Sequence, residues 1–481
     1  MFSNIGVSNS YRKGVDWLTV ILYILLVAFG WSNLYAANYN PEVGLQFSLS
    51  SEYFKQLMWI GVSAVFAGII MLSDSKLFVE AAWPIYGASL VLLTLVLLIG
   101  KEVYGAKSWL AIGPIQFQPA EFTKIGAALV ISRLMSRYGF RFDIKQYATL
   151  AAVILVPVGY ILLQNDTGSA LVYFVFLLPM FREGLTPHIL LLGTLCLVGA
   201  IAALLLGTWI AMLSLLVLSV VALQVVMSRQ GHSKTALIAI IIGAVVGGGL
   251  TLANIFLLGS RYPVEFPVLI GLAVVSVYLI VMVIVHRLRN IWLFLLYVWV
   301  GVGTSFAAGF VFEHVLIEHQ RTRINVLFGI EDDPLGAGYN VNQSMIAIGS
   351  GGLLGKGFLS GTQTKLNFVP KQTTDFIFCT VGEEWGFIGS LALVGTYLFF
   401  FLRLIHLAEQ QHSVFSRVYG YCVACVFFFH FTINICMTIG LMPVIGIPLP
   451  FFSYGGSSLW GFSVMLFIFL KLDTDRNFLI R

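Results

Sequence analysis

The feature that most constrains this chain is the recurrence of long apolar stretches along nearly its whole length. Of its 481 residues, 59% are hydrophobic and only 10% are charged, whereas soluble domains carry about 25% charged residues. A helix needs about 20 apolar residues to cross the hydrocarbon core of a bilayer. The sequence therefore predicts an all-α fold, a polytopic integral membrane helical bundle, rather than a set of soluble domains.

The apolar stretches give about 14 predicted spans, of which the fourth and the sixth are short. An even count places both termini on the same side of the membrane. The longest connection, 313–384, lies between spans 11 and 12, and unstructured connections longer than ~12–15 residues are often functional. The predicted spans are 17–36, 55–73, 81–100, 122–136, 146–163, 167–181, 188–206, 208–227, 235–258, 267–286, 291–312, 385–405, 417–439 and 457–472.

Basic residues predict the orientation of the bundle. Inner loops carry an excess of lysine and arginine, and most of the 27 basic residues fall inside when the N-terminus is inside. We therefore expect both termini in the cytoplasm, the chain in the cytoplasmic (inner) membrane, and the loop 313–384 outside. The net charge of +5 follows from this asymmetry, so it indicates the lipid bilayer as environment and no nucleic-acid partner.

The long outer loop contains three consecutive acids, Glu331, Asp332 and Asp333, followed by Pro334. Acids beside an apolar membrane can act as a general base or bind a cation. An Asp-Pro pair also favours a turn, and spacing alone leaves both interpretations open. The glycines between 349 and 361 fit neither dinucleotide-binding nor Walker spacing, and they indicate tight turns.

Two shorter outer stretches also contain unusual residues. Trp109 is typical of an interfacial anchor. Glu121 and Lys124 have the spacing of an ion pair at a helix start, which predicts either a surface pair or a functional pair at membrane depth. Asp166 lies between two spans, where its side chain can cap the second.

The last outer stretch, 440–456, has so many prolines and glycines that a continuous helix is excluded. Non-helical backbone near membrane depth is tolerated where protein buries it or where it lines a wet cavity. The stretch therefore predicts a re-entrant loop beside a substrate cavity.

Six of these stretches, in this order, resemble the SEDS family of peptidoglycan polymerases. Each is weak alone, whereas six in order are specific. The Gly-Thr-Gln segment and the stretch 442–448 resemble the elongation branch of the family more than the division branch. The matching pieces are Gln118-Pro119-Ala120-Glu121, Gln164-Asn165-Asp166-Thr167-Gly168, Asp333 to Tyr339, Gly361-Thr362-Gln363, Thr374-Asp375-Phe376-Ile377-Phe378, and Pro448-Leu449-Pro450 with Ser453-Tyr454-Gly455-Gly456-Ser457.

The resemblance covers roughly 10–186 and 291–481. The family has ten spans, so about four helices within 187–290 are expected to be extra. Ser108, Asn165, Lys371 and Thr373 depart from the family pattern. We expect one polytopic domain, 1–481, made of family-like spans in 1–186, extra helices in 187–290, a span at 291–312, the catalytic outer loop 313–384, and family-like spans in 385–481 with the re-entrant loop at 440–456.

The resemblance implies that the chain polymerises lipid II into β-1,4-linked glycan strands during cell elongation, with undecaprenyl pyrophosphate as leaving group. Asp333 matches the family's essential aspartate and would be the general base. Basic side chains or a divalent cation, Mg²⁺ or Mn²⁺, would neutralise the pyrophosphate. The implied substrate-binding residues are Trp109, Gln118, Glu121, Lys124, Arg321, Arg323, Lys365 and Ser453.

The implied partners are lipid II, a class B penicillin-binding protein that supplies transpeptidation, and the rod-complex proteins MreC and MreD. Other classes of function stay open. A lipid II flippase needs a lateral cavity that opens alternately to the two sides. A ligase-like glycosyltransferase of O-antigen shares the general plan but not the motif order. A non-catalytic scaffold of the cell-wall synthesis complex would not need Asp333.

Overall fold

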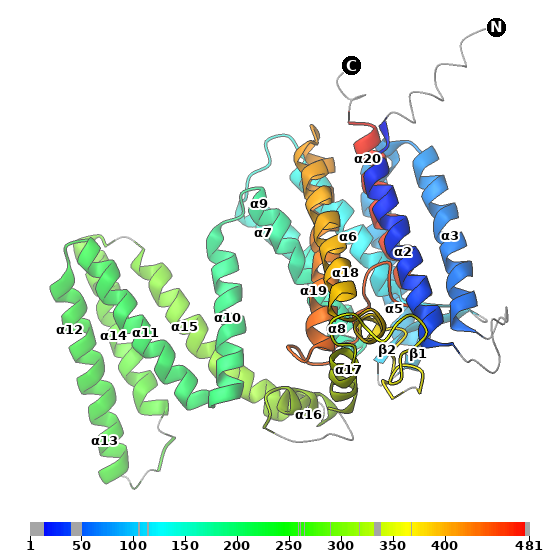
Figure 1. Ribbon diagram of the computed structural model, residues 1–481. Helices are drawn as coiled ribbons and strands as arrows, with labels where there is room; N and C mark the ends of the chain where they lie inside the picture. Colours follow the sequence, from blue (N-terminus) through cyan, green and yellow to red (C-terminus); the bar gives the residue numbers. More distant parts are fainter. Residues whose placement is uncertain are drawn as a thin grey trace. The chain divides into compact units, whose positions relative to one another are not determined.

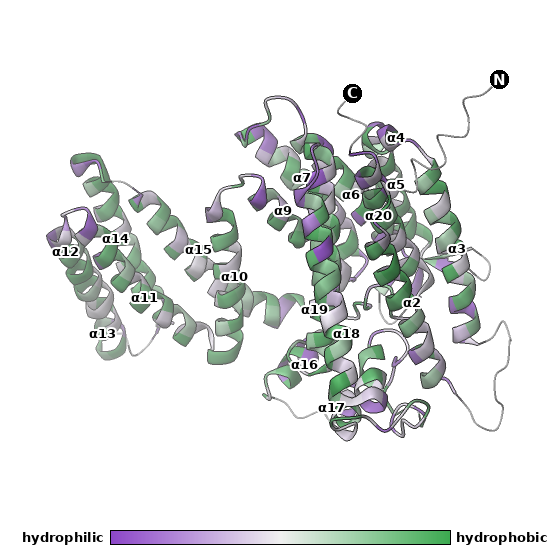
Figure 2. Ribbon diagram, turned by 45° about the horizontal axis from the view of Figure 1, so that its top comes forward, coloured by the Kyte–Doolittle hydropathy of each residue, from purple (hydrophilic) through white to green (hydrophobic). Residues whose placement is uncertain are grey.

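The computed structural model consists mainly of long helices joined mostly by short connections (Figure 1). It describes residues 14–39, 51–103, 106–112, 115–257, 259, 261–263, 265–288, 290–316, 318–330, 338–366 and 368–476. The chain forms two compact units: unit 1 contains Met1–Leu185 and Thr322–Arg481, and unit 2 contains Thr186–Arg321. The helices are largely hydrophobic, and hydrophilic residues gather at their ends and in the connections (Figure 2).

Unit 1 is built from both ends of the chain. Its N-terminal helices are α2 (Trp17–Ala37), α3 (Glu52–Leu72), α4 (Ser75–Glu80), α5 (Ala82–Ile99), α6 (Pro119–Met135), α7 (Ile144–Leu163), α8 (Thr167–Val172) and α9 (Leu177–Arg182), with a 3-10 turn at Tyr173–Phe176. Its C-terminal helices are α17 (Tyr339–Ser350), α18 (Ile377–Glu409), α19 (Val414–Thr438) and α20 (Gly456–Thr474). Helix α16 (Glu318–Leu327) contains the boundary between the units.

Unit 2 contains α10 (Pro187–Leu206), α11 (Thr208–Arg229), α12 (Ser233–Gly243), α13 (Gly249–Phe256), α14 (Glu265–His286) and α15 (Ile291–Phe310). Helix α12 continues into α13 through a π turn at Ala244–Gly248. This turn packs closely on α14, because a Cβ atom added at Gly271 would lie 2.8 Å from Gly247 Cα. Small residues of this kind let membrane helices approach each other closely.

The predicted membrane bundle is confirmed. Among the described residues, 12 helices are long and apolar enough to cross a membrane. The predicted fourth and sixth spans coincide with α6 and with the broken apolar segment Thr167–Arg182, which are not among those 12. The count of 14 spans therefore stays a prediction.

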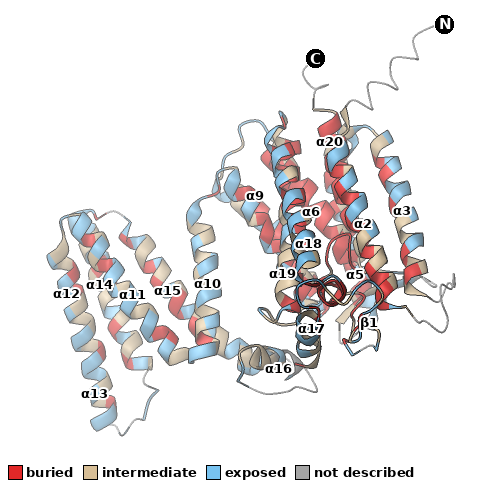
Figure 3. Ribbon diagram, viewed as in Figure 1, coloured by how far each residue is buried: buried red, intermediate tan, exposed pale blue. Residues whose placement is uncertain are grey.

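The hydrophobic core of unit 1 lies around α19 and α20. Of the most apolar part of each helix, 83% is buried in α20 and 61% in α19, whereas the candidate spans of unit 2 have only 6% to 33% of theirs buried (Figure 3). Helix α6 is also buried along nearly its whole length. The polar residues on these helices must therefore find partners within the protein.

The connection between α5 and α6 forms a small antiparallel sheet, which the prediction of helices alone missed. The strands β1 (Lys101–Val103), β2 (Ala106–Ile112) and β3 (Ile115–Phe117) lie in the order β1-β2-β3. Trp109 on β2 is opposite Lys101, and Leu110 is opposite Phe117. The sheet is tied to the next connection because Lys107 N donates to Gln164 O (3.0 Å).

The long outer loop is more regular than a connection without structure. It contains α16 and α17, and α18 begins at Ile377 rather than at the predicted position 385. The polar residues before 385 are helical because protein buries them, a condition that a hydropathy pattern does not reveal.

Candidate functional site

The chain between α19 and α20 folds back into unit 1 without forming a helix, which confirms the prediction of non-helical backbone there. We call 440–455 the re-entrant loop. Asn434 on α19 donates to the Ile447 carbonyl oxygen (2.7 Å), and the Tyr397 hydroxyl on α18 donates to the Pro450 carbonyl oxygen (2.5 Å). These bonds satisfy two carbonyl groups of the irregular backbone with side chains inside the protein, as such backbone requires. Its buried apolar side chains include Ile447, Leu449, Phe451 and Phe452.

Two glycines allow other helices to touch the re-entrant loop. A Cβ atom added at Gly30 on α2 would lie 2.6 Å from Phe452 O. A Cβ atom added at Gly168 on α8 would lie 2.7 Å from Ile445 Cγ2 and 2.8 Å from Ile445 O. Gly168 belongs to the Gln164–Gly168 motif, so this motif packs against the re-entrant loop.

The Asp166 side chain joins the starts of α6 and α8. Its carboxylate accepts hydrogen bonds from Ser169 N (3.0 Å), which confirms the predicted cap. It also accepts from Gln118 Nε2 (2.6 Å) and from Ser169 Oγ (2.9 Å). Gln118 and Asp166 belong to two of the six family-like motifs, and the structure brings them together.

Glu121 and Lys124 form the predicted ion pair, with 2.8 Å between Lys124 Nζ and Glu121 Oε2. The pair is buried, so the alternative of a surface pair is wrong. Lys124 Nζ also lies 2.9 Å from His430 Nε2 on α19 and 5.4 Å from the centre of the Phe462 ring on α20. Because an ammonium group only donates, His430 accepts at Nε2. A buried Glu–Lys–His cluster thus joins α6 to α19.

Asp375, in the Thr374–Phe378 motif, is also linked to α19. Its main-chain carbonyl oxygen accepts from Asn434 Nδ2 (2.8 Å), so Asn434 links this motif to the re-entrant loop. Burial raises the pKa of the Asp375 carboxyl above its ordinary value, and the nearby Lys371 and Arg323 oppose this shift. Lys371 Nζ lies 3.8 Å from Asp375 Oδ2.

The three basic residues predicted to hold pyrophosphate contact different segments. Arg323 Nη1 donates to Val444 O (3.0 Å) of the re-entrant loop. Arg321 Nε instead donates to Leu316 O (3.0 Å), within unit 2. Lys365 Nζ donates to Leu359 O and lies 5.1 Å from the centre of the Tyr39 ring. Of the two in unit 1, Arg323 therefore contacts the re-entrant loop and Lys365 contacts a different part of the described chain.

Trp109 and Ser453 are also placed by the structure. Trp109 is half-buried on β2. Ser453 is buried, its hydroxyl accepts from Leu449 N (2.9 Å), and its carbonyl oxygen accepts from Gln56 Nε2 (3.4 Å). The Ser453 hydroxyl therefore shapes the turn of the re-entrant loop.

Asp333, with Glu331 and Asp332, lies outside the described residues. The predicted general base and the predicted cation-binding acids are therefore not placed. Within the part of the chain that the structure describes, no group of three or more His, Cys, Asp or Glu side chains could hold a metal ion.

Sequence reasoning missed four buried polar residues of this region. His430 and Asn434 are one helical turn apart on α19 and interrupt a phenylalanine-rich apolar run. Glu383 and Glu384 interrupt the start of α18. Ionisable and amide side chains within predicted spans are costly unless they have a role, and this signal could have found His430 and Asn434 in the predicted span 417–439. Glu383 and Glu384 lie in the predicted loop 313–384, where the same signal does not apply.

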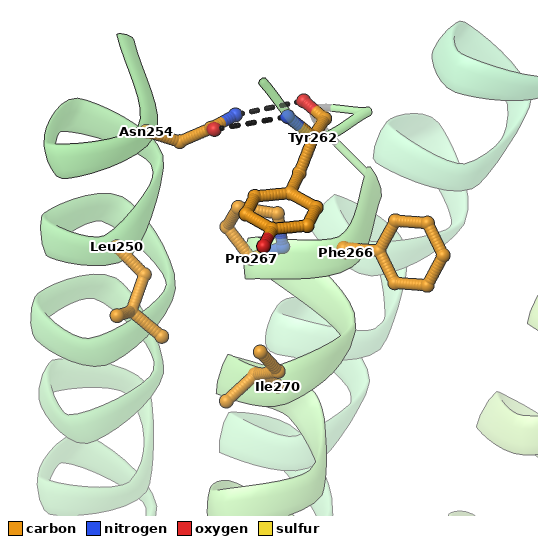
Figure 4. Close-up of a pocket in the computed structure, with 6 residues that line it drawn as sticks. All are labelled: Leu250, Asn254, Tyr262, Phe266, Pro267 and Ile270. Carbon is orange, nitrogen blue, oxygen red and sulfur yellow. Dashed lines mark hydrogen bonds between the residues drawn. The ribbon is translucent and has the colours of Figure 1, made fainter. Parts of the chain in front are cut away.

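A separate cavity of about 430 Å³ lies within unit 2, between α13 and α14 (Figure 4). Asn254 Nδ2 donates to Tyr262 O (2.8 Å), and Tyr262 N donates to Asn254 Oδ1 (3.2 Å) at its edge. No residue of the family-like motifs lines it, so the cavity gives no evidence about the motif site. Its lining residues are Leu250, Asn254, Tyr262, Phe266, Pro267 and Ile270.

The described helices are long and apolar enough to cross a membrane, and they enclose a buried polar cluster, so the chain is a polytopic membrane protein. The sequence model of the FtsW, RodA and SpoVE family, described as "Cell cycle protein", matches residues 16–257 and 267–477. The chain belongs to this family, which confirms the resemblance. The family match runs through 187–257, and the assignment of extra helices to 187–290 stays a prediction.

Curated relatives are named as peptidoglycan glycosyltransferases. The chain is 31% identical over 446 residues to the peptidoglycan glycosyltransferase RodA of Treponema pallidum, covering 92% of this chain and 94% of the relative. It is 28% identical over 407 residues to the peptidoglycan glycosyltransferase MrdB of Escherichia coli K12, covering 83% of this chain and 80% of the relative.

Solved structures have the same fold. One is a chain from a peptidoglycan synthase complex studied for its coordination of polymerization and crosslinking, with a TM-score of 0.58, 26% identity, and coverage of 96% of this chain and 98% of that one. Another is the rod shape determining protein RodA of Thermus thermophilus, with a TM-score of 0.55, 24% identity, and coverage of 96% and 97%.

Proposed function

We propose that this chain, a peptidoglycan glycosyltransferase, polymerises lipid II into β-1,4-linked glycan strands during cell elongation. One observation carries the proposal: motif segments far apart in the sequence meet at the re-entrant loop (440–455). Gly168 packs on Ile445, and Asn434 joins Asp375 to Ile447. Side chains fixed on several packed helices hold a site rigidly enough for chemistry.

In the proposed reaction, the 4-hydroxyl of the acceptor sugar attacks the anomeric carbon of the donor. The new glycosidic bond forms as the bond to undecaprenyl pyrophosphate breaks, so an α-linked donor gives a β-linked product by inversion. Asp333 accepts the hydroxyl proton as general base. The pyrophosphate leaves with the electron pair of the broken bond.

The negative charge of the leaving group needs positive partners. Arg323 has the best support, because it contacts the re-entrant loop and its charge acts on Asp375. Lys371 has similar support, since its ammonium group lies near the same carboxyl. Arg321 has less support, because its guanidinium group hydrogen bonds within unit 2.

A divalent cation, Mg²⁺ or Mn²⁺, is a further proposal. Glu331, Asp332 and Asp333 have the carboxylate oxygens that such ions prefer. A bound cation would supply charge stabilisation to the pyrophosphate. The steps proposed for the protein's own residues do not depend on it.

The proposal includes the setting of the enzyme. We place the chain in the cytoplasmic membrane with both termini in the cytoplasm and with 313–384 outside, because basic residues gather on the inner side. Its partners are a class B penicillin-binding protein, MreC and MreD. The likeness to a chain of a peptidoglycan synthase complex supports the first of these.

Purified full-length protein, together with its penicillin-binding partner, tests the proposal. We expect it to convert labelled lipid II into glycan strands with release of undecaprenyl pyrophosphate. Movement of lipid II across vesicle membranes without strand formation would favour a flippase. A scaffold would be favoured if strand formation and lipid II movement both continued after this chain was removed.

A further inference from the structure

Helix α18 is broken near its outer end, at Gly386, whose φ of 63° and ψ of −158° are not helical. The break frees backbone groups on both sides of it. Lys356 N and Gly357 N donate to the carbonyl oxygens of Glu383 and Glu384, each at 3.0 Å. The segment 351–357 of the long loop therefore supplies hydrogen bonds that the broken helix lacks.

The amides after the break are satisfied by the same segment. Phe387 N donates to Gly352 O (2.9 Å), and Ile388 N donates to Leu353 O (3.1 Å). A Cβ atom added at Gly355 would lie 2.2 Å from Glu384 O, so only glycine fits this approach. The glycines predicted to form turns thus also pack the loop onto α18.

The Glu383 side chain fixes the next part of the loop. The side chain is fully buried, and its carboxylate accepts six hydrogen bonds. The main-chain amides of Thr362, Gln363 and Thr364 donate to it at 2.7, 2.9 and 3.0 Å. The hydroxyls of Thr362 and Thr364 donate at 3.1 and 2.9 Å, and Lys356 Nζ donates at 2.7 Å.

The neighbouring Glu384 has a different environment. Its side chain is also buried, but neither carboxylate oxygen accepts a hydrogen bond from the described residues. The amides of Leu359 and Gly361 lie near it without hydrogen-bond geometry. A change from carboxylate to amide therefore replaces one of the two acceptor oxygens at position 383 by a donor, and so loses either the four hydrogen bonds to Oε1 or the two to Oε2. At position 384 it loses no hydrogen bond from the described residues.

We propose that Glu383 is a positioning residue, which folds the Gly361–Thr364 turn onto the broken helix and so holds the adjoining Lys365 for the pyrophosphate of the lipid-linked donor. The inference rests on the proposed function. The turn places Lys365 against Leu359 O and the Tyr39 ring. An ammonium group held in this way attracts the diphosphate before and during the reaction, so its loss weakens substrate binding more than it slows turnover.

The test measures KM and kcat for lipid II in the purified enzyme with its partner. Glu383→Gln presents an amide NH₂ to backbone N–H donors, and we expect KM to rise at least about tenfold with kcat changed by less than threefold. Lys365→Met should give the same pattern. The double variant should be no worse than either single variant, because the two residues act on one interaction. Glu384→Gln is the matched control and should behave like wild type.

Additive effects in the double variant, or wild-type kinetics for Glu383→Gln, would overturn the inference. The proposed function would still stand as long as the wild-type enzyme polymerises lipid II. If Glu383→Gln does not fold, Thr362→Val and Thr364→Val each remove one hydroxyl donor to the same carboxylate. These variants should raise KM a few-fold and leave kcat unchanged. Unchanged KM in both would overturn the inference in that case. An inactive wild-type enzyme would instead count against the proposed function.

Discussion

At the scale of single residues, Lys124 shows what spacing in the sequence predicts and what it does not. The Glu121–Lys124 pair follows from two residues three apart on a helix. His430 is 306 positions away, so no local pattern connects it to Lys124. Its contact depends on the packing of α6 against α19, which is a property of the folded bundle.

The buried pair gives the first prediction. Lys124→Met leaves the Glu121 carboxylate buried without its cation, and breaking a buried ion pair costs about 3–5 kcal/mol. We expect a clearly lower melting temperature of the detergent-solubilised protein. The double variant Glu121→Gln with Lys124→Met removes both charges and should recover part of the loss. Equal melting of Lys124→Met and wild type would show that the pair does not stabilise the fold.

Asp375 gives a pH-dependent prediction. Burial raises its pKa above the ordinary value of 3.8, so the folded protein resists its ionisation. The contribution of the protonated Asp375 carboxyl to the free energy of unfolding is therefore fully present below pH 3.8, and it is lost as the pH rises through the pKa of Asp375 in the folded protein. Asp375→Asn should melt like wild type at pH below 3.8 and be more stable at neutral pH.

Lys371→Met is a control that should change stability in the direction opposite to Asp375→Asn. It removes a cation that favours the ionised carboxylate, so it should lower stability at neutral pH and have little effect in acid. If Asp375→Asn were less stable than wild type only at neutral pH, this result would contradict the raised pKa of Asp375.

At the scale of elements, helices were predictable and their interruptions were less so. Long apolar runs located α2, α7 and the spans of unit 2 to within a few residues. Proline and glycine spacing predicted the re-entrant loop. The start of α18 and the small sheet were missed, because both depend on burial and pairing with segments distant in sequence.

The contact between α8 and the re-entrant loop gives an element-scale prediction. Gly168→Ala places a Cβ atom 2.7 Å from Ile445 Cγ2 and 2.8 Å from Ile445 O. Overpacking of this kind typically costs about 1–3 kcal/mol, and polymerisation should fall with it. Gly159→Ala on α7 is the control, since a Cβ atom there meets no atom within 4 Å. Equal stability and activity of the two variants would show that this close contact has no consequence.

At the scale of the whole molecule, composition predicted the membrane class, and the ordered motifs predicted the family. The division into two units could not be predicted, because it follows from long-range contacts. The sequence motifs predicted which segments contribute to the motif site, but they did not predict how these segments contact each other. Asn434 joins two of those segments, yet it belongs to none of the six.

The orientation is tested by single cysteines in a variant without the five native ones. Leu354 in the long loop and Tyr138 between α6 and α7 are both well exposed. Leu354→Cys should react with an impermeant maleimide in intact spheroplasts, whereas Tyr138→Cys should react only after permeabilisation. The reverse pattern would invert the proposed topology.

The helices within 187–290 are predicted to supply no catalytic side chain. The ring of His232 lies at a tilt to that of His286 within unit 2, with 5.3 Å between ring centres. His232→Ala and Arg261→Ala should therefore keep polymerisation within a few-fold of wild type. Complete loss of activity in stably inserted protein would give this part of unit 2 a direct role.

The central claim is that the chain forms glycan strands by base-catalysed transfer at Asp333. The decisive measurement is the rate of polymerisation of labelled lipid II by Asp333→Asn, with Asp332→Asn as matched control. A general base typically contributes about 10²–10⁴-fold, so Asp333→Asn should be slower by at least about the lower end of that range, while Asp332→Asn loses much less. A near-wild-type rate for Asp333→Asn, in protein that inserts and binds its partner normally, would contradict the account.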